Sequence, residues 1–550
     1  TESHVRDGLE SVLKILHLLD GVGWDAPFDS APLTRETGEH LLADHTTALF
    51  GPAPAGRGVR IMVTIPGEAA HDYLLVRELV SAGMDCMRIN CAYDDQATWE
   101  RLIDHLRHAN RDLRRACRVV LDIAGPKLRT GDLGPGPEVI KIKPSRDVFG
   151  RVTMPALVVL AGPGDGSAAT LPLDAMLTLD ADVPGGLDAG GTVDFVDARG
   201  RSRHFRIREL AGASIVAELD RTAYIVSGTV LRFQTPAGTQ TRTLVRIPPA
   251  PSALLLKKGD TLVLTLPSVE GREAVRDEHD RVLTPARIGI TLPEVFRDAR
   301  PGEGVWFDDG KIGGIIRAVG PEQMTVDITQ ARPHGSRLRA GKGVNLPDTR
   351  LRLSALTEKD EHDLPFIAQH ADLIGYSFVR HAEDIFNLQR HLTALDAGRR
   401  GLILKVETRH AFDELPKLLL ACMRGGPSGV MIARGDLAVE CGFERMAEVQ
   451  EEILWICEAA HTPVIWATQV LESLAKTGMP SRAEVTDAAM SERAECVMLN
   501  KGPFIRDAVR TLDDILRRMQ SHQEKKRAML RPLHLAEKVL ADLSGDHALR

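Results

Sequence analysis

Short apolar runs alternate with amphipathic segments along most of the chain. Eight runs have the continuous apolar character of strands buried in a parallel sheet, at 60–65, 85–90, 118–123, 372–378, 401–407, 429–434, 463–469 and 496–500. Eight segments with a helical period lie between and after them, at 72–83, 98–113, 357–370, 382–395, 412–423, 446–460, 482–494 and 504–519. Strict alternation of eight strands with eight helices predicts a closed (β/α)8 barrel.

One long region interrupts this alternation after the third strand. Residues 132–347 are rich in Gly, Pro, Val and Thr and contain strand-like pieces such as "TLVLTL" and "SIVAEL". This texture predicts a separate β domain inserted in a barrel loop. The fold class is therefore α/β: a (β/α)8 TIM barrel with a large inserted β domain after the third strand and a small helical N-terminal segment.

Domain boundaries follow from the same pattern. The expected divisions are a helical N-terminal segment at 1–57, the barrel at 58–131 and 348–522, the inserted β-rich domain at 132–347, and a C-terminal tail at 523–550.

Composition excludes several classes of protein. The chain of 550 residues has a formal net charge of -7 and contains no basic block, which argues against nucleic-acid binding. No apolar run approaches the roughly 20 residues that a membrane span needs, and no signal-peptide pattern is visible. Seven scattered cysteines without a C-x-x-C pair indicate reduced thiols, so we expect a cytoplasmic protein.

Polar residues close nearly every predicted strand. They are Thr64, Arg88, Asn90, Asp122, Ser377, Lys405, Glu407, Arg434, Asp436, Thr468 and Asn500. Because the carboxyl ends of all barrel strands form one rim, which carries the active site in such barrels, we expect these side chains to converge there.

The types of residue on this rim indicate a chemistry. Glu407 and Asp436, on adjacent strands, could hold a hard divalent cation such as Mg²⁺, which prefers oxygen ligands. Lys405 and Arg88 could meet an anionic substrate. The alternative for each residue is structural: a Lys–Glu ion pair, an Arg-Gly-Asp turn, or a threonine that caps a strand. Only their convergence on one rim favours a functional site.

At these residues the sequence resembles the pyruvate kinase family. The matching stretches are "GMDCMRINCAYDD", "LDIAGPKLRTG", "GVWFDDGKI", "KGVNLP", "LILKVE", "MIARGDLAVE", "ATQVLESL" and "SRAEVTDA". They follow the family's order and spacing over about 58–520. The inserted region falls where the family has its mobile B domain, a lid over the nucleotide.

The resemblance implies roles for individual residues. Lys405 would lie near the transferred phosphoryl group, and Glu407 and Asp436 would bind Mg²⁺ or Mn²⁺. The amides of Gly435 and Asp436 would receive the substrate carboxylate, beside Thr468, which would relay a proton to the enolate. Arg88 and Arg129 would meet phosphate groups, and Asn90 would lie in the nucleotide and cation region. The implied substrates are phosphoenolpyruvate and ADP, which give pyruvate and ATP, and we expect a homo-oligomer.

The resemblance also implies a change at the family's monovalent-cation site. Asn90 and Asp122 remain, but Ala92 and Ile123 replace two further ligands, and Lys127 replaces an acidic residue. The Lys127 ammonium is expected near Asp122, where it would neutralise the field of that carboxylate. This predicts that K⁺ is not required.

Other departures leave rival functions open. Ala124 and Tyr93 replace a lysine and a histidine near the nucleotide path, and the family's C-terminal effector domain has no counterpart in the sequence. The first rival is a metal-dependent lyase or aldolase that acts on pyruvate or phosphoenolpyruvate. The second is a degenerate homologue with a regulatory role and no catalysis.

Overall fold

A closed barrel of eight parallel strands forms the centre of the molecule. The computed structural model describes residues 4–21, 33–163, 173–250 and 252–520. Around the barrel the strands are β1 (Arg60–Thr64), β2 (Cys86–Asn90), β3 (Arg118–Asp122), β25 (Leu373–Tyr376), β26 (Gly401–Val406), β27 (Ser428–Ala433), β28 (Val464–Ala467) and β29 (Cys496–Leu499). The predicted eight-stranded barrel is confirmed.

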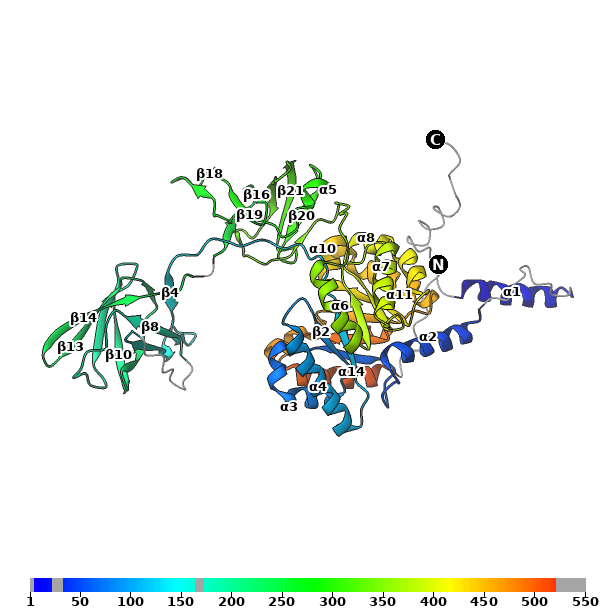
Figure 1. Cartoon of the computed structure of the whole chain (residues 1–550), viewed down its shortest axis with the longest axis horizontal. Helices are drawn as coiled ribbons and strands as arrows, with labels where there is room; N and C mark the ends of the chain where they lie inside the picture. Colours follow the sequence, from blue (N-terminus) through cyan, green and yellow to red (C-terminus); the bar gives the residue numbers. More distant parts are fainter. Residues whose placement is uncertain (1–3, 22–32, 164–172, 251, 521–550) are drawn as a thin grey trace.

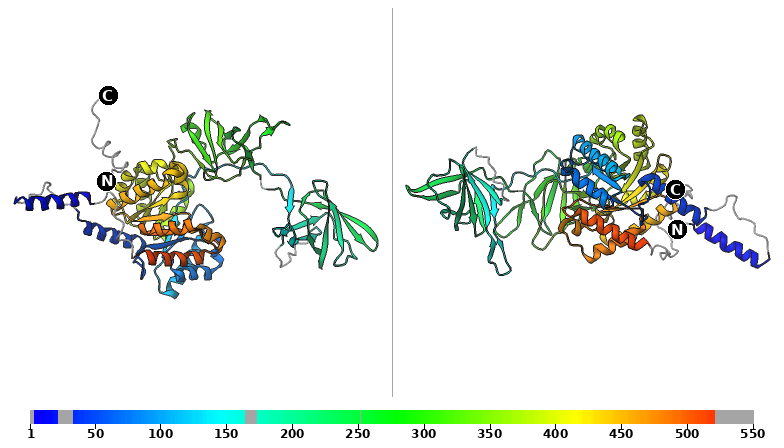
Figure 2. Two further views of the ribbon diagram at one scale, coloured as in Figure 1. Left: turned by 180° about the vertical axis from the view of Figure 1, so that it is seen from behind. Right: turned by 90° about the horizontal axis from the view of Figure 1, so that it is seen from below.

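Helices cover the outside of this barrel (Figures 1 and 2). They are α3 (Tyr73–Ala82), α4 (Gln96–Leu113), α6 (Glu358–His370), α7 (Ala382–Ala394), α8 (Arg409–Asp413), α9 (Leu415–Cys422), α10 (Arg434–Cys441), α11 (Met446–Ala459), α12 (Glu472–Thr477), α13 (Arg482–Met490) and α14 (Ile505–Met519). Among them, α8, α10 and α12 are short additions between a strand and its main helix. Because α10 begins directly after β27, the segment "RGDLAVE" is helical from its first residue.

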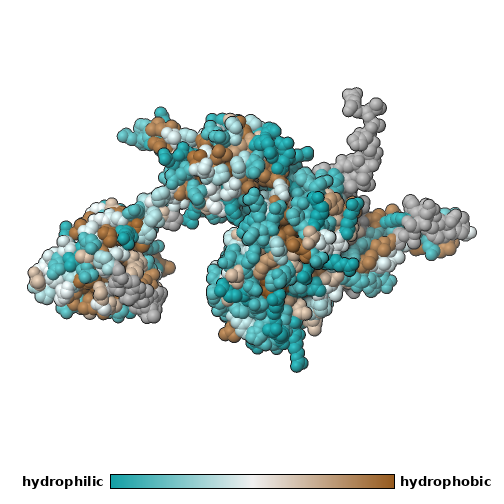
Figure 3. Space-filling model, in the orientation of Figure 1, coloured by the Kyte–Doolittle hydropathy of each residue, from teal (hydrophilic) through white to brown (hydrophobic). Residues whose placement is uncertain are grey.

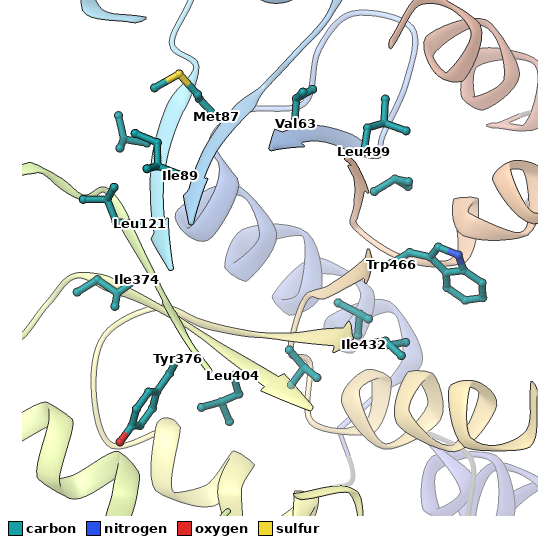
Figure 4. Close-up of a cluster of buried hydrophobic side chains, with 14 of the residues drawn as sticks. Val63, Met87, Ile89, Leu121, Ile374, Tyr376, Leu404, Ile432, Trp466 and Leu499 are labelled. Carbon is teal, nitrogen blue, oxygen red and sulfur yellow. The ribbon is translucent and has the colours of Figure 1, made fainter. Parts of the chain in front are cut away.

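The core has two layers. Between strands and helices lie apolar side chains such as Ile89, Leu121 and Leu404 (Figure 4). Inside the barrel, the opposite faces of the strands bury a smaller cluster that includes Met62, Val120 and Ile403. Burial on both faces explains why the strands are continuously apolar in sequence.

The N-terminal segment closes the barrel at the amino ends of its strands. It contains α1 (Val5–Leu19) and α2 (Arg35–Phe50), and the last two residues of α2, Leu49 and Phe50, belong to the cluster inside the barrel. A Cβ on Gly429 would come within 2.5 Å of the Leu49 side chain, so glycine is required for this close approach. Arg118 donates hydrogen bonds of 2.6 Å to the carbonyls of Ala48 and Leu49.

The insertion after β3 contains two β bodies, where sequence predicted a single β domain. The first is a closed barrel of β7 (Ala156–Ala161), β8 (Ala175–Leu179), β9 (Thr192–Val196), β10 (Ser202–Ala211), β11 (Ser214–Leu219), β13 (Val230–Thr235) and β14 (Gly238–Val245). The second is a sheet of β16 (Thr261–Thr265), β19 (Ala286–Gly289), β20 (Gly304–Phe307), β21 (Ile312–Val319), β22 (Gln323–Gln330) and β24 (Val344–Asn345), with helix α5 (Val295–Asp298). Each body buries its own apolar core.

Short strand pairs complete the insertion. They are β4 (Val139–Ile142) with β12 (Ala223–Val226), β5 (Ser145–Arg146) with β6 (Val152–Met154), β15 (Leu254–Leu256) with β23 (Ser336–Leu338), and β17 (Val275–Arg276) with β18 (Val282–Thr284). In Figures 1 and 2 the seven-stranded body lies farther from the (β/α)8 barrel than the six-stranded sheet does.

The six-stranded sheet contacts the rim of the (β/α)8 barrel. Gly310, with φ of +79°, lies so close to Phe443 that an added Cβ would be 3.1 Å from its ring. The Asn345 side-chain amide donates a 3.0 Å hydrogen bond to Glu440 of α10. The sheet is therefore anchored beside the carboxyl ends of the strands.

The surface is mixed in character. Most of the barrel face drawn in Figure 3 is hydrophilic, whereas helix α1 exposes apolar residues such as Leu9 and Leu19. Within the described residues, no helix combines the length and the apolar character needed to cross a membrane. The predicted tail at 523–550 lies outside the described residues.

Candidate active site

The polar strand ends meet in one cleft at the carboxyl rim, which we call the rim cleft. Its volume is about 640 Å³. The predicted residues that line it are Arg88, Asn90, Lys127, Arg129, Lys405, Glu407, Gly435, Asp436 and Thr468. Asp122 is fully buried at the end of β3 and bonds to two of them. Of the polar strand ends that the sequence singled out, Thr64 and Arg434 do not line the cleft: Thr64 accepts a hydrogen bond from Arg88, and Arg434 bonds to Asp487.

Asp122 is the buried acidic centre of the site. Its Oδ2 atom lies 2.6 Å from Nη2 of Arg88 and 3.2 Å from Nζ of Lys405. Burial favours the neutral carboxyl, but the two cations outweigh it and hold the pKa of Asp122 below its ordinary value. Its buried Oδ1 atom has no hydrogen-bond partner among the described residues, and Gly375 on β25 leaves the space that this oxygen occupies.

Lys405 and Glu407 leave the end of β26 as an ion pair. The Lys405 ammonium lies 3.1 Å from Glu407 Oε1 and donates a 2.7 Å hydrogen bond to Ser377 Oγ. Burial alone would lower the pKa of Lys405, but Glu407 and Asp122 raise it above its ordinary value, so the side chain is a stable cation. The other oxygen of Glu407 accepts a 2.7 Å hydrogen bond from the amide of Phe378, whose φ is +54°.

Lys127 lies elsewhere than expected. Its ammonium donates to both carboxylate oxygens of Asp436, at 2.9 and 3.0 Å, and lies 5.8 Å from the centre of the Phe378 ring. Sequence reasoning placed this ammonium near Asp122, but Arg88 and Lys405 already occupy that carboxylate. Lys127 is therefore paired with one of the two predicted metal ligands.

Thr468 has a strained backbone. Its φ is +65°, a region that β-branched residues rarely adopt, and Gln469 follows with φ of +60°. The strain turns the threonine hydroxyl into the rim cleft, where it accepts a 3.2 Å hydrogen bond from the Gly435 amide. The first amides of α10 have no partner within their own helix, so this corner of the cleft is rich in donors.

Arg434 holds this corner in place, a role that sequence reasoning did not assign. It donates to the carbonyls of Ala467 and Thr468 at 3.0 and 2.5 Å, and it forms a two-pronged ion pair with Asp487 at 2.5 and 2.8 Å. Its guanidinium also lies 5.0 Å from the Trp466 ring centre. The sequence signal was available, since Asp487 belongs to the quoted stretch "SRAEVTDA".

Arg129 and Asn90 also line the rim cleft. Arg129 donates from Nη1 to the Gly341 carbonyl at 3.1 Å, which ties it to the turn between β23 and β24 of the insertion. Asn90 uses its side-chain oxygen to accept a 3.1 Å hydrogen bond from the Ala92 amide. Tyr93, 55% exposed, is part of the same wall.

Comparison with known proteins decides the family. A family model described as pyruvate kinase, barrel domain, matches residues 56–158 and 238–504, which is more than half of the chain. The chain belongs to the pyruvate kinase family. The two matched segments flank 159–237, so most of the seven-stranded body falls outside the pyruvate kinase model.

The chain is also similar in sequence to individual pyruvate kinases. The chain is 31% identical over 300 residues to a pyruvate kinase of Geobacillus stearothermophilus, covering 53% of this chain and 48% of that one. It is 34% identical over 267 residues to that of Corynebacterium efficiens, covering 47% and 52%. A rat protein named pyruvate kinase PKLR is 34% identical over 229 residues, covering 40% and 38%. The chain spans about half the length or less of these relatives.

Membership in the pyruvate kinase family implies a need for a divalent metal ion, and the residues of the rim cleft fit one. Glu407 and Asp436 present carboxylate oxygens to the same cleft, which suits a hard cation. The described residues contain no group of three or more His, Cys, Asp or Glu side chains placed for a metal. Two protein carboxylates would leave the remaining positions to water and substrate oxygens, as Mg²⁺ favours.

Proposed function

We propose that this protein transfers the phosphoryl group of phosphoenolpyruvate to ADP, which yields pyruvate and ATP. The observation that carries the proposal is the meeting of Lys405, Arg88 and the carboxylates Glu407 and Asp436 in one cleft. Phosphoryl transfer requires alignment and cationic stabilisation more than covalent help from the protein. A buried, permanently charged lysine beside two carboxylates supplies both features.

The geometry supports specific roles in substrate binding. The substrate carboxylate would replace the Thr468 hydroxyl as partner of the Gly435 amide and also meet the Asp436 amide. Lys405 would lie beside the phosphoryl group, with Arg88 and Arg129 on its other oxygens. Thr468, held by Arg434, would deliver a proton to the methylene carbon of the enolate.

Glu407 and Asp436 would hold Mg²⁺ or Mn²⁺, which when bound polarises phosphoryl and enolate oxygens. In this role Asp436 must exchange its contact with the Lys127 ammonium for the metal ion. Release from Asp436 would free Lys127 to stabilise negative charge elsewhere in the rim cleft. The ion pair therefore supports a competition between Lys127 and the metal at Asp436.

We also propose that K⁺ is not required, with Asn90, Asp122 and Lys127 in place of the monovalent-cation site. The sequence placed Lys127 near Asp122, but in the structure Arg88 and Lys405 balance Asp122. Lys127 instead pairs with Asp436. Fixed ammonium and guanidinium groups thus already balance the two carboxylates.

The test is a coupled assay with phosphoenolpyruvate, ADP and Mg²⁺ that follows pyruvate and ATP separately. Equal amounts of both products would support the proposal. Pyruvate formed without ATP would mean that phosphoenolpyruvate is hydrolysed and would contradict transfer to ADP. A lyase or aldolase would instead release pyruvate and an aldehyde from a 4-hydroxy-2-oxo acid supplied in place of phosphoenolpyruvate. No product from folded protein at any Mg²⁺ or Mn²⁺ concentration would favour a regulatory homologue.

A further inference from the structure

A second cleft lies at the root of the insertion, on the far side of Asp436 from the rim cleft. Its volume is about 600 Å³, and it is enclosed by 344–352, the segment that returns from the six-stranded sheet, and by the loops after β25 and β26. We call it the root cleft. It shares only Lys127, Phe378 and Asp436 with the rim cleft.

Arg380 is the unexplained group in this cleft. The side chain follows β25 and is 6% exposed, yet its guanidinium forms no hydrogen bond or ion pair with any described residue. Its Nη1 atom is completely buried. Asp384, Glu440 and Glu407 lie near enough to favour the charged guanidinium, but none of them hydrogen-bonds it, so its donors are open to an acceptor.

The surroundings of Arg380 add positive charge. Arg350, on the returning segment, is exposed and has no ion-pair partner among the described residues. His410 Nε2 lies 3.4 Å from His381 Nδ1. Burial lowers the pKa of His410, the nearby His381 and Arg350 lower it further, and Glu414 and Asp413 oppose them, so the imidazole is a neutral hydrogen-bonding group.

The acidic residues of the root cleft are engaged with other groups. Asp298 pairs with Arg352 at 2.8 Å, Glu303 accepts from Thr349 at 2.5 Å, Asp348 accepts from the Gly304 amide at 3.0 Å, Asp436 pairs with Lys127 at 2.9 Å, and Glu440 accepts from Asn345 at 3.0 Å. Burial raises the pKa of Glu440 to about 7, so its negative charge is incomplete near neutral pH. None of them hydrogen-bonds the Arg380 guanidinium.

We propose that the root cleft binds a small phosphate compound, with phosphate oxygens on the accessible edge of the Arg380 guanidinium and further contacts from Arg350 and His410. The fork geometry of arginine suits phosphate, and the volume suits a small organic phosphate as well as the free ion. Since Arg380 follows β25 of the barrel and Arg350 lies on the segment that returns from the six-stranded sheet, the ligand bridges the barrel and the root of the insertion. This inference does not depend on the proposed reaction.

Calorimetric titration of the whole protein tests the site, with inorganic phosphate, glycerol 3-phosphate and succinate as separate probes. Arg129→Met removes a cation that lines only the rim cleft, and we expect it to retain phosphate binding. Arg380→Met should weaken that binding about tenfold or more, as loss of a charge-assisted pair predicts. Arg350→Met, an exposed change that leaves folding intact, should weaken it by about threefold or more.

Arg390→Met, on the exposed face of α7, is the matched control and should bind phosphate as the wild type does. Tighter binding of glycerol 3-phosphate than of phosphate would identify an organic ligand, and the reverse would identify the free ion. Binding of succinate alone overturns the proposal. So does wild-type affinity in both Arg380→Met and Arg350→Met, or an absence of phosphate binding.

Discussion

The two mouths of the (β/α)8 barrel are built from opposite kinds of side chain. At the amino end, Leu49 and Phe50 enter the barrel and are 0% and 1% exposed. At the carboxyl end, Asp122, Lys405 and Glu407 are 0%, 7% and 5% exposed, and all three are charged groups. The named side chains are buried to a similar degree, so burial alone does not distinguish the two mouths.

The difference lies in what each mouth contributes. Burial of the α2 plug removes apolar surface from water and stabilises the fold. The carboxyl mouth holds charges whose desolvation opposes folding unless they are paired, and one oxygen of Asp122 is left without a partner. We expect substitutions at the carboxyl mouth to change activity and those at the amino mouth to change stability.

The largest expected effect is at Asp436. Asp436→Ala removes one of two proposed metal carboxylates and should lower turnover on the order of a thousandfold, because metal stabilisation is worth several kcal/mol. The thermal midpoint should stay the same or rise. Asp104→Ala, which breaks an exposed ion pair with Arg107, is the control. Ordinary Mg²⁺-dependent turnover in Asp436→Ala would exclude the assignment.

Lys405 should act mainly in the transition state. Lys405→Met is expected to raise the activation free energy by about 3–4 kcal/mol, which lowers kcat a few hundredfold. The change in KM should be much smaller. Ser377→Ala removes only the 2.7 Å hydrogen bond to the ammonium and should cost less than about tenfold. Steady-state kinetics measures both, and a kcat within a few-fold of wild type in Lys405→Met would contradict the role.

The amino mouth should respond in the opposite way. Leu49→Ala leaves a cavity inside the barrel and should lower the free energy of unfolding by about 2–5 kcal/mol. The kcat of the folded protein should not change. Leu420→Ala, at a side chain 63% exposed, should cost less than about 0.5 kcal/mol. Denaturant titration measures the free energy of unfolding of both variants, and steady-state kinetics measures the kcat of the folded proteins. A loss of kcat in folded Leu49→Ala would contradict the contrast between the mouths.

A smaller effect is expected at the Lys127–Asp436 pair. Lys127→Met removes the ammonium that competes for Asp436, so Mn²⁺ should bind up to about fivefold more tightly without substrate, in keeping with a partly exposed ion pair. Electron paramagnetic resonance of free Mn²⁺ measures this directly. Lys257→Met, which breaks a partly exposed pair with Asp280 in the insertion, should leave affinity unchanged. Weaker Mn²⁺ binding in Lys127→Met would refute the competition.

The smallest expected effect is that of monovalent salt. Turnover in KCl and in tetramethylammonium chloride at equal ionic strength should agree within about twofold, because Arg88 and Lys405 already balance Asp122. Lys127→Glu should slow the enzyme sharply, and KCl should restore only part of the rate since Ala92 offers no hydroxyl. A wild-type rate tens of times higher in KCl would overturn this prediction.

The local pattern of apolar and polar residues was sufficient to predict the architecture of the barrel. Continuous apolar runs and helical periods reflect burial along each element, so eight strands, their order and the polar ends on one rim could all be predicted from sequence. The motifs around Lys405, Asp436 and Thr468 were equally local. Each lies within a few residues of a strand end, and the barrel topology carries every such end to the same place.

Partners distant in sequence were decided only by the tertiary structure. Lys127 meets Asp436 across 309 positions, and nothing in "GPKLRTG" indicates which of two nearby carboxylates its flexible side chain reaches. The same holds for Leu49 in the barrel and for Arg380 without an acceptor, since both depend on how separate elements pack. Local sequence determines which side chains an element offers, whereas the three-dimensional fold determines which charge, cavity or empty space each one meets.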